Sequence, residues 1–148
     1  MSAEALSPRQ FGPGGKYTTR FGTPNYSKNR YDPIASPEDV QHHASMMEKY
    51  GSKPQSIEAV HTASGRRVGS MNWFPGGSNP GPNQVTTSAA GLEVDPAKPT
   101  IFKTVVSAPA RRKGVASAML DHARAIEPEL QHSHALSEDA VAWAKRKP

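Results

Sequence analysis

Apolar residues recur at helical spacing in one stretch of the second half of the chain. Four of them share one face of a predicted helix that ends before Pro128: Val115, Met119, Ala123 and Ile126. The run before it, residues 100–106, is rich in β-branched and aromatic residues and is bounded by Pro99 and Pro109. Such a run is typical of a strand. The pattern therefore predicts a strand, a short loop and a helix in succession.

The same patterns predict elements on both sides of this unit. Ser36 followed by Pro37 is a helix start, and Gly65 falls in a turn between two alternating segments. The further predicted elements are, in chain order, a helix over 36–51, a hairpin with arms 56–62 and 67–74, a short edge segment over 85–94, a strand over 130–134 and a helix over 137–146.

Prolines and glycines interrupt residues 1–35 repeatedly, so we predict an extended arm there and a folded domain over residues 36–148. Up to Tyr31 the arm contains five basic residues, one acidic residue and five aromatic residues. Aromatic side chains beside cations are suited to lying on a surface, which could be the arm's own domain, a neighbouring subunit or a nucleic acid. A protein surface is favoured because no recognisable nucleic-acid module follows. A flexible tail is the alternative.

Composition narrows the function classes. The 148-residue chain has no cysteine, which excludes disulfides, thiolate metal sites and a thiol nucleophile. Only 35% of residues are hydrophobic, with 14 prolines and 12 glycines, so we expect a core of modest size. The net charge of +5 favours acidic partners. No stretch is typical of a signal peptide or a membrane span, so we expect a soluble protein in the cytoplasm.

The loop between the predicted strand and helix of residues 100–126 is basic and contains a glycine. Its sequence is Arg111-Arg112-Lys113-Gly114-Val115-Ala116. The first amides of a helix have no intrahelical acceptor and lie at the positive end of its dipole, so the backbone can hold an anion there. Gly114 allows close approach, and the three cations add charge. The pattern predicts a pyrophosphate site; a solvated basic turn before an ordinary helix is the alternative.

Arg111-x-x-Gly114-x-Ala116, after a strand ending in Val106, resembles the acyl-coenzyme A loop of the GNAT N-acetyltransferases, although Pro109 lies one position later than is usual in that family. The resemblance implies an α/β fold with a mixed, mostly antiparallel sheet flanked by helices. It also implies that the loop and helix start bind the pyrophosphate of acetyl-CoA, while the strand binds the pantetheine arm. The implied cofactor-binding residues are Val106, Arg111, Arg112, Lys113, Gly114, Val115 and Ala116.

The end of the chain carries a second resemblance. Gln131-His132-Ser133, followed by a helix with Ser137-Glu-Asp and Trp143-Ala, is similar to small GNAT-like proteins of actinobacterial phages. The GNAT family normally adds two more strands after this helix. The sequence therefore predicts a truncated version of the fold that lacks the last strands.

The catalytic groups usual in the family are missing at the matched positions. Residues 100–106 contain no carboxylate to act as base, and Ala144 stands where the family has a tyrosine that protonates the thiolate. His132 and His134 alternate along a predicted strand and share a face, so one could act as base, or the pair could supply two metal ligands. Glu93 is a weaker candidate for the base.

Two hypotheses about function follow. The first is an N-acetyltransferase that uses acetyl-CoA at the 111–116 loop and no metal. The second is a catalytically inactive GNAT fold that serves as a structural or docking component of an assembly such as a phage virion, anchored on neighbouring subunits by residues 1–35. Both are consistent with the sequence.

Overall fold

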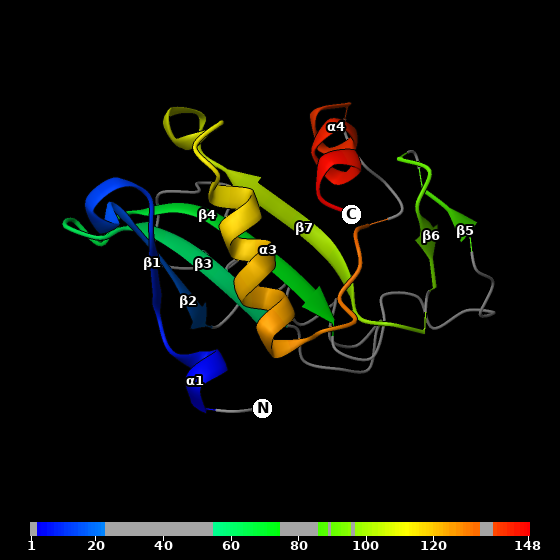
Figure 1. Cartoon of the computed structure of the whole chain (residues 1–148), viewed down its shortest axis with the longest axis horizontal. Coiled ribbons are helices and arrows are strands. Elements are labelled where there is room, and N and C mark those ends of the chain that lie inside the picture. The colour runs from blue at the N-terminus through cyan, green and yellow to red at the C-terminus, as the bar shows by residue number, and fades with distance from the viewer. Residues whose placement is uncertain (1–2, 23–54, 75–85, 89, 96, 134–137) are drawn as a thin grey trace, which may run out of the picture.

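The fold is built around one antiparallel sheet. The structure is a computed structural model and describes residues 3–22, 55–74, 86–88, 90–95, 97–133 and 138–148. The sheet has five strands in the order β1-β2-β3-β4-β7, and each strand is antiparallel to its neighbours (Figure 1). Its strands are β1 (Arg9–Phe11), β2 (Tyr17–Gly22), β3 (Gln55–His61), β4 (Arg67–Phe74) and β7 (Thr100–Val106).

Helices and a small ribbon complete the described part. One face of the sheet is crossed by α3 (Val115–Ile126), and α4 (Glu138–Arg146) lies near the end of the sheet formed by β7 (Figure 1). The other elements are short: α1 (Ala3–Leu6), the 3-10 turns η1 (Pro13–Gly15) and η2 (Ala108–Ala110), and a two-stranded ribbon of β5 (Thr86–Thr87) and β6 (Glu93–Val94). None of the described helices is long and apolar enough to cross a membrane.

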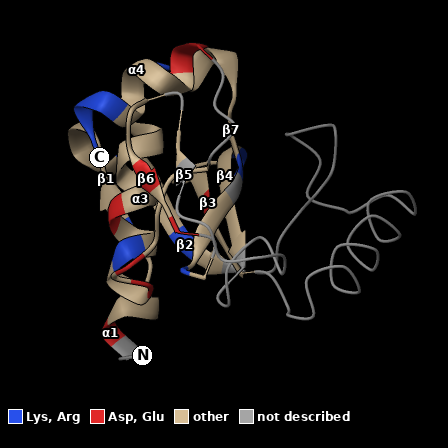
Figure 2. Ribbon diagram, turned by 90° about the vertical axis from the view of Figure 1, so that its right-hand side faces the viewer, with Lys and Arg blue, Asp and Glu red and all other residues tan. Residues whose placement is uncertain are grey.

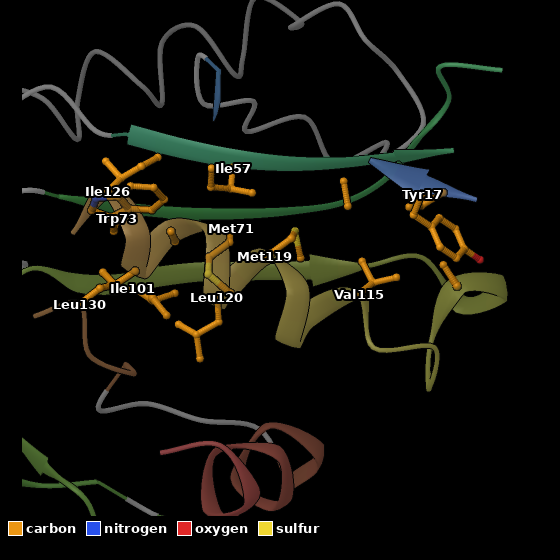
Figure 3. Close-up of a cluster of buried hydrophobic side chains, with 14 of the residues drawn as sticks. Tyr17, Ile57, Met71, Trp73, Ile101, Val115, Met119, Leu120, Ile126 and Leu130 are labelled. Atoms are coloured by element: carbon orange, nitrogen blue, oxygen red, sulfur yellow. The ribbon is translucent and has the colours of Figure 1, made fainter. Parts of the chain in front are cut away.

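The central strands β3 and β4 are buried along most of their length, and one face of the sheet packs on α3. Ile57 on β3 pairs with Met71 on β4, and both point toward α3 (Figure 3). The buried stripe of α3 that covers them is the one predicted from the sequence, Val115, Met119, Ala123 and Ile126, with Leu120 beside it. Burial of such apolar side chains stabilises each by about 1.5–3 kcal/mol relative to exposure, so this interface holds the domain together.

Gly69 on β4 lets α3 approach the sheet closely. A Cβ atom built at Gly69 would lie 3.1 Å from Cε of Met119, 3.1 Å from the carbonyl oxygen of Val105 and 3.2 Å from Cγ1 of Val115. Two of these neighbours belong to the start of α3, and one is strand backbone. The small residue therefore sets the distance between the sheet and the N-terminal half of α3.

The prediction that residues 1–35 form an extended arm is wrong for residues 3–22. These residues form α1, β1, η1 and β2, and β2 pairs with β3 from Tyr17 opposite His61 to Gly22 opposite Ser56. The boundary predicted between residues 35 and 36 therefore does not separate an arm from a domain in the described part. Residues 23–35 lie outside the described residues.

Turn chemistry explains this error. The prolines and the positive-φ glycines of this segment lie between the strands and not within them. Pro8 precedes β1, and Pro13 with two glycines at positive φ makes the turn between β1 and β2. Tyr17, Thr19 and Phe21 alternate toward the core, which is the period of a strand. The described aromatic residues of this segment, Phe11, Tyr17 and Phe21, thus pack on its own domain, one of the surfaces considered from sequence.

A buried histidine joins the N-terminal segment to α3. Nε2 of His122 donates to the carbonyl oxygen of Ala5 (2.8 Å), and its Nδ1 is hydrogen-bonded to the hydroxyl of Thr19 (2.9 Å). A carbonyl oxygen can only accept, so Nε2 carries a proton. Burial lowers the pKa of His122, which favours the neutral form of the ring.

Most of the other elements predicted in the described part are present. The hairpin is confirmed as β3 and β4, and the last helix as α4. The edge segment over 85–94 becomes the β5–β6 ribbon. The strand predicted over 130–134 is reduced, in the described residues, to one parallel bridge between Gln131 and Thr100. The helix predicted over 36–51 lies outside the described residues.

Candidate functional site

The loop after β7 is tightly folded before α3 begins. Ser107 donates its amide to the carbonyl oxygen of Val68 (2.8 Å), and η2 then turns the chain. Arg111 folds back, and its Nε donates to the carbonyl oxygen of Val106 (3.1 Å). The end of the strand and the loop are thereby fixed to each other, which positions the following helix start.

The N-terminus of α3 has no cap from a side chain. Gly114 is the N-cap residue, at φ 78°, and the first turn contains no acidic residue. The first intrahelical bond is that from the amide of Ala118 to the carbonyl oxygen of Gly114 (2.9 Å), so the amides of residues 115–117 have no acceptor within the helix. A Cβ at Gly114 would meet no atom within 4 Å. This helix start is therefore open to an anion.

The predicted cofactor-binding residues fall into two groups. Arg111, Arg112, Lys113 and Gly114 are exposed around the helix start, and none of these three cations forms an ion pair with a described residue. Val106, Val115 and Ala116 are buried or half-buried. The side chain of Val115 belongs to the core, so only its backbone amide can serve a ligand.

The outer edge of β7 carries a single bridge in the described part of the chain. After α3 the chain returns beside the start of β7 and forms a parallel bridge between Thr100 and Gln131. Beyond this bridge no described strand pairs with the outer edge of β7. A register shift in the pairing with β4 places one extra residue, Phe102, next to the bridge. We call the strip along the outer edge of β7 between this bridge and Val106 the crevice; it lies toward the carboxyl ends of two parallel segments, where α/β sheets commonly bind ligands.

Gln131 closes the narrow end of this crevice. Its backbone accepts from the amide of Ile101 (3.0 Å) and donates to the carbonyl oxygen of Pro99 (3.0 Å). Its side chain accepts from the amide of Asp95 (3.0 Å) and donates to the hydroxyl of Thr100 (2.8 Å) and to the carbonyl oxygen of Asp95. One residue thus joins the start of β7, the end of the β5–β6 ribbon and the segment after α3.

The helix α4 packs beside the start of α3. The indole Nε1 of Trp143 donates to Oγ of Ser117 in the first turn of α3 (3.0 Å). Acidic residues begin α4 and basic residues end it, which complements the helix dipole (Figure 2). Ala144, which aligns with the family's tyrosine, is fully buried and has no group that could donate a proton to a thiolate.

His132 packs against Trp143. The two rings meet edge to face, with centroids 4.8 Å apart, and His132 is 2% exposed. Its Nε2 donates to the carbonyl oxygen of Lys147 (2.7 Å), whereas its Nδ1 is buried and has no hydrogen-bond partner. Burial lowers the pKa of His132, and the neighbouring Arg124 lowers it further.

The other candidate residues do not join this group. His134 lies outside the described residues, so its predicted pairing with His132 stays a prediction. Glu93 is exposed on β6, in the ribbon and not in the main sheet. Within the described ranges, no group of three or more His, Asp or Glu side chains is arranged to hold a metal ion.

Sequence reasoning located the loop before α3 but missed three features of the candidate site. The open outer edge of β7 and the bridge at Gln131 depend on chain segments that meet only in the fold. The contact between Trp143 and Ser117 joins residues 26 positions apart, so no local sequence pattern predicts it. The alternation of Tyr17, Thr19 and Phe21 was visible in the sequence and could have identified β2.

Comparison with solved structures identifies the fold. The xEco2 acetyltransferase domain superposes with a TM-score of 0.53 at 16% sequence identity, covering 95% of this chain and 90% of that domain. The same domain bound to a K105-CoA conjugate gives a TM-score of 0.52 at 16% identity, covering 88% of this chain and 87% of that one. No protein-family model and no curated protein sequence matches the chain. The chain therefore has a mixed α/β fold, an antiparallel sheet flanked by helices, that matches GNAT-like acetyltransferase folds.

Proposed function

We propose that this protein is an acetyl-CoA-dependent N-acetyltransferase that binds the pyrophosphate of acetyl-CoA at the start of α3. The observation that carries the proposal is the direct connection between the open edge of β7 and an uncapped helix start. Val106 ends the strand, and Gly114 begins the helix after a short basic loop. The structural neighbour with a bound CoA conjugate supports the proposal, because a similar fold holds that ligand there.

The dimensions of the crevice fit an extended arm. Val106 lies six positions after Thr100, which is about 20 Å of strand at roughly 3.3 Å per residue. A pantetheine arm that runs along this edge from the helix start brings its thioester to the bridge between Thr100 and Gln131. Backbone groups on the outer edge of β7 bond the arm as an added strand would be bonded.

The residues of this chain then have separate roles. The amides of residues 115–117 bind phosphate oxygens, and Arg112 and Lys113, both exposed, neutralise their charge. Arg111 holds the loop against the end of β7 through its bond to Val106. The acceptor is a primary amine, which attacks the thioester carbonyl carbon and displaces coenzyme A thiolate.

The test is calorimetric titration of acetyl-CoA into three proteins: the wild type, Gly114→Glu and Gly114→Ala. Both variants place an L residue at φ 78°, so they share the same backbone strain. Only Gly114→Glu places a negative charge at the helix start. We expect micromolar binding by the wild type, a small loss in Gly114→Ala and a loss of at least 100-fold in Gly114→Glu. Equal affinity of the two variants would refute this binding site.

The second hypothesis, an inactive fold that docks into an assembly such as a virion, is supported by the missing carboxylate in residues 100–106 and by Ala144 in place of tyrosine. Its other support was an arm free to bind neighbours, and residues 3–22 instead belong to the folded part. Protein partners of residues 1–35 and a place in a virion therefore stay predictions. We favour the enzyme because the open crevice has no role in the docking hypothesis.

A further inference from the structure

Three turns lie side by side at one end of the main sheet (Figure 1). They are residues 12–16 before β2, residues 62–66 between β3 and β4, and residues 107–114 after β7. The amide of Thr62 donates to the carbonyl oxygen of Lys16 (2.8 Å), which joins the first two turns. The amide of Ser107 donates to the carbonyl oxygen of Val68 (2.8 Å), which joins the third turn to β4. Backbone bonds therefore fix the three turns relative to one another.

The three turns carry five basic residues and no acidic residue. The basic residues are Lys16, Arg66, Arg111, Arg112 and Lys113, and all five are exposed. The N-terminus of α3, which is the positive end of its dipole, lies at the same surface. We call this surface the basic end.

Carboxylates of the adjoining strands do not neutralise the basic end. Glu58 is the only acidic residue in β2, β3, β4 and β7, and it pairs with Arg20 (3.2 Å) and Arg67 (3.8 Å). Lys16 and the three cations of residues 111–113 form no ion pair with a described residue. The basic end therefore presents its positive charge to solvent, where an anionic partner can reach it.

The width of the basic end exceeds that of one pyrophosphate site. Neighbouring strands lie about 4.8 Å apart, so the three spacings from β2 across β3 and β4 to β7 make about 14 Å. Lys16 lies on the β2 side, whereas residues 111–113 follow β7. A nucleic-acid duplex carries one negative charge per roughly 1.7 Å of its axis, so a surface of this width faces several phosphates.

The other side chains of the three turns decide which anionic partner fits. Besides the five cations, the turns contain only glycine, proline, alanine, serine and threonine. Protein interfaces need large apolar or aromatic anchors, and these turns have none. Binding of a single strand uses exposed aromatic rings for stacking, but Phe11 and Tyr17 beside the first turn stack on each other and Tyr17 is buried. Cations among small residues suit a phosphate backbone.

We propose that the basic end binds the phosphate backbone of a double-stranded nucleic acid without reading its sequence. The surface extends beyond the acetyl-CoA site proposed above, because Lys16 and Arg66 have no role in that site. It does not depend on acetyl transfer. Failure of acetyl-CoA to bind would refute the proposed function and leave this inference standing.

The experiment is fluorescence anisotropy of a labelled 20-base-pair DNA duplex of mixed sequence, titrated with the full chain between 50 and 200 mM salt. The variants are Lys16→Glu and Arg66→Glu. Lys98→Glu is the matched control, because it makes the same charge change at an exposed position just before β7, at the opposite end of the sheet. All three positions are exposed, so the variants should fold, which circular dichroism checks.

We expect wild-type affinity to fall by about 100-fold over this salt range, the loss for roughly four phosphate contacts. Lys16→Glu and Arg66→Glu should each weaken binding by about tenfold and reduce the salt slope by about one. Lys98→Glu should weaken it less than about twofold. Duplexes of different sequence should bind equally.

An equal loss in Lys98→Glu would show attraction to the net charge alone and would overturn the assignment to the basic end. Tighter binding of a 20-nucleotide single strand than of the duplex would overturn the choice of a double strand. Displacement of the duplex by a lower concentration of polyglutamate of equal charge would assign the surface to an acidic protein instead.

Discussion

Replacement of Gln131 by alanine should open the closed end of the crevice without unfolding the sheet. The substitution removes three side-chain hydrogen bonds, two to Asp95 and one to Thr100, and leaves the backbone bridge in place. At roughly 1 kcal/mol for each bond, the free energy of unfolding should fall by about 3 kcal/mol. With an m-value near 2 kcal/mol per molar urea, the midpoint should drop by about 1–2 M.

Two measurements make this prediction specific. Hydrogen exchange should show the amide of Asp95 losing its protection, because Oε1 of Gln131 is its acceptor, while the amide of Ile101 keeps its backbone acceptor. Glu129→Ala, at an exposed position two residues earlier, is the matched control and should change stability by less than about 0.5 kcal/mol. A midpoint of Gln131→Ala within error of the control, with Asp95 still protected, would contradict the role given to Gln131.

Two further predictions concern the scaffold. Gly69→Ala should destabilise the fold by about 1–3 kcal/mol in thermal denaturation, because the added Cβ meets the backbone of Val105 at 3.1 Å and cannot be relieved by a side-chain movement alone. His122 has a lowered pKa, so the unfolded chain binds its proton more readily, and stability should decrease as the pH falls below 6.5 toward the native pKa. Urea titrations at pH 7.5 and 5.5 should show a smaller difference for His122→Gln than for the wild type; an equal difference would exclude His122 as the cause.

The parts of the fold that could be predicted from sequence are those encoded by contiguous periodicity. The stripe of α3 and the two arms of the β3–β4 hairpin each repeat at one period over a whole element, bounded by proline or glycine. The loop before α3 was predicted for the same reason, since its glycine and cations directly precede the helix. Such local patterns can be recognised in a sequence without knowing which residues pack against the element.

The misassigned parts depend on partners distant in the chain. Residues 9–22 contain turn formers at every boundary, and their strands form only because β3 offers an edge to β2. The predicted strand over 130–134 fails for the opposite reason, because after Gln131 the described chain pairs with no further strand on β7. Propensity is similar in the two segments, and pairing with an available edge decides between them.

Contacts between distant segments also hold the candidate site in place. They decide which variants can distinguish the docking hypothesis from the enzyme hypothesis. The helix α3 has the amides proposed to bind an anion at one end, where Trp143 bonds Ser117, and it is joined through His122 to Ala5 and Thr19. Removal of the N-terminal residues would therefore loosen α3 and weaken coenzyme binding as well as any docking. A truncation cannot distinguish the two functions. Gly114→Glu compared with Gly114→Ala can, because the two variants share the same backbone strain and differ in the charge at the helix start.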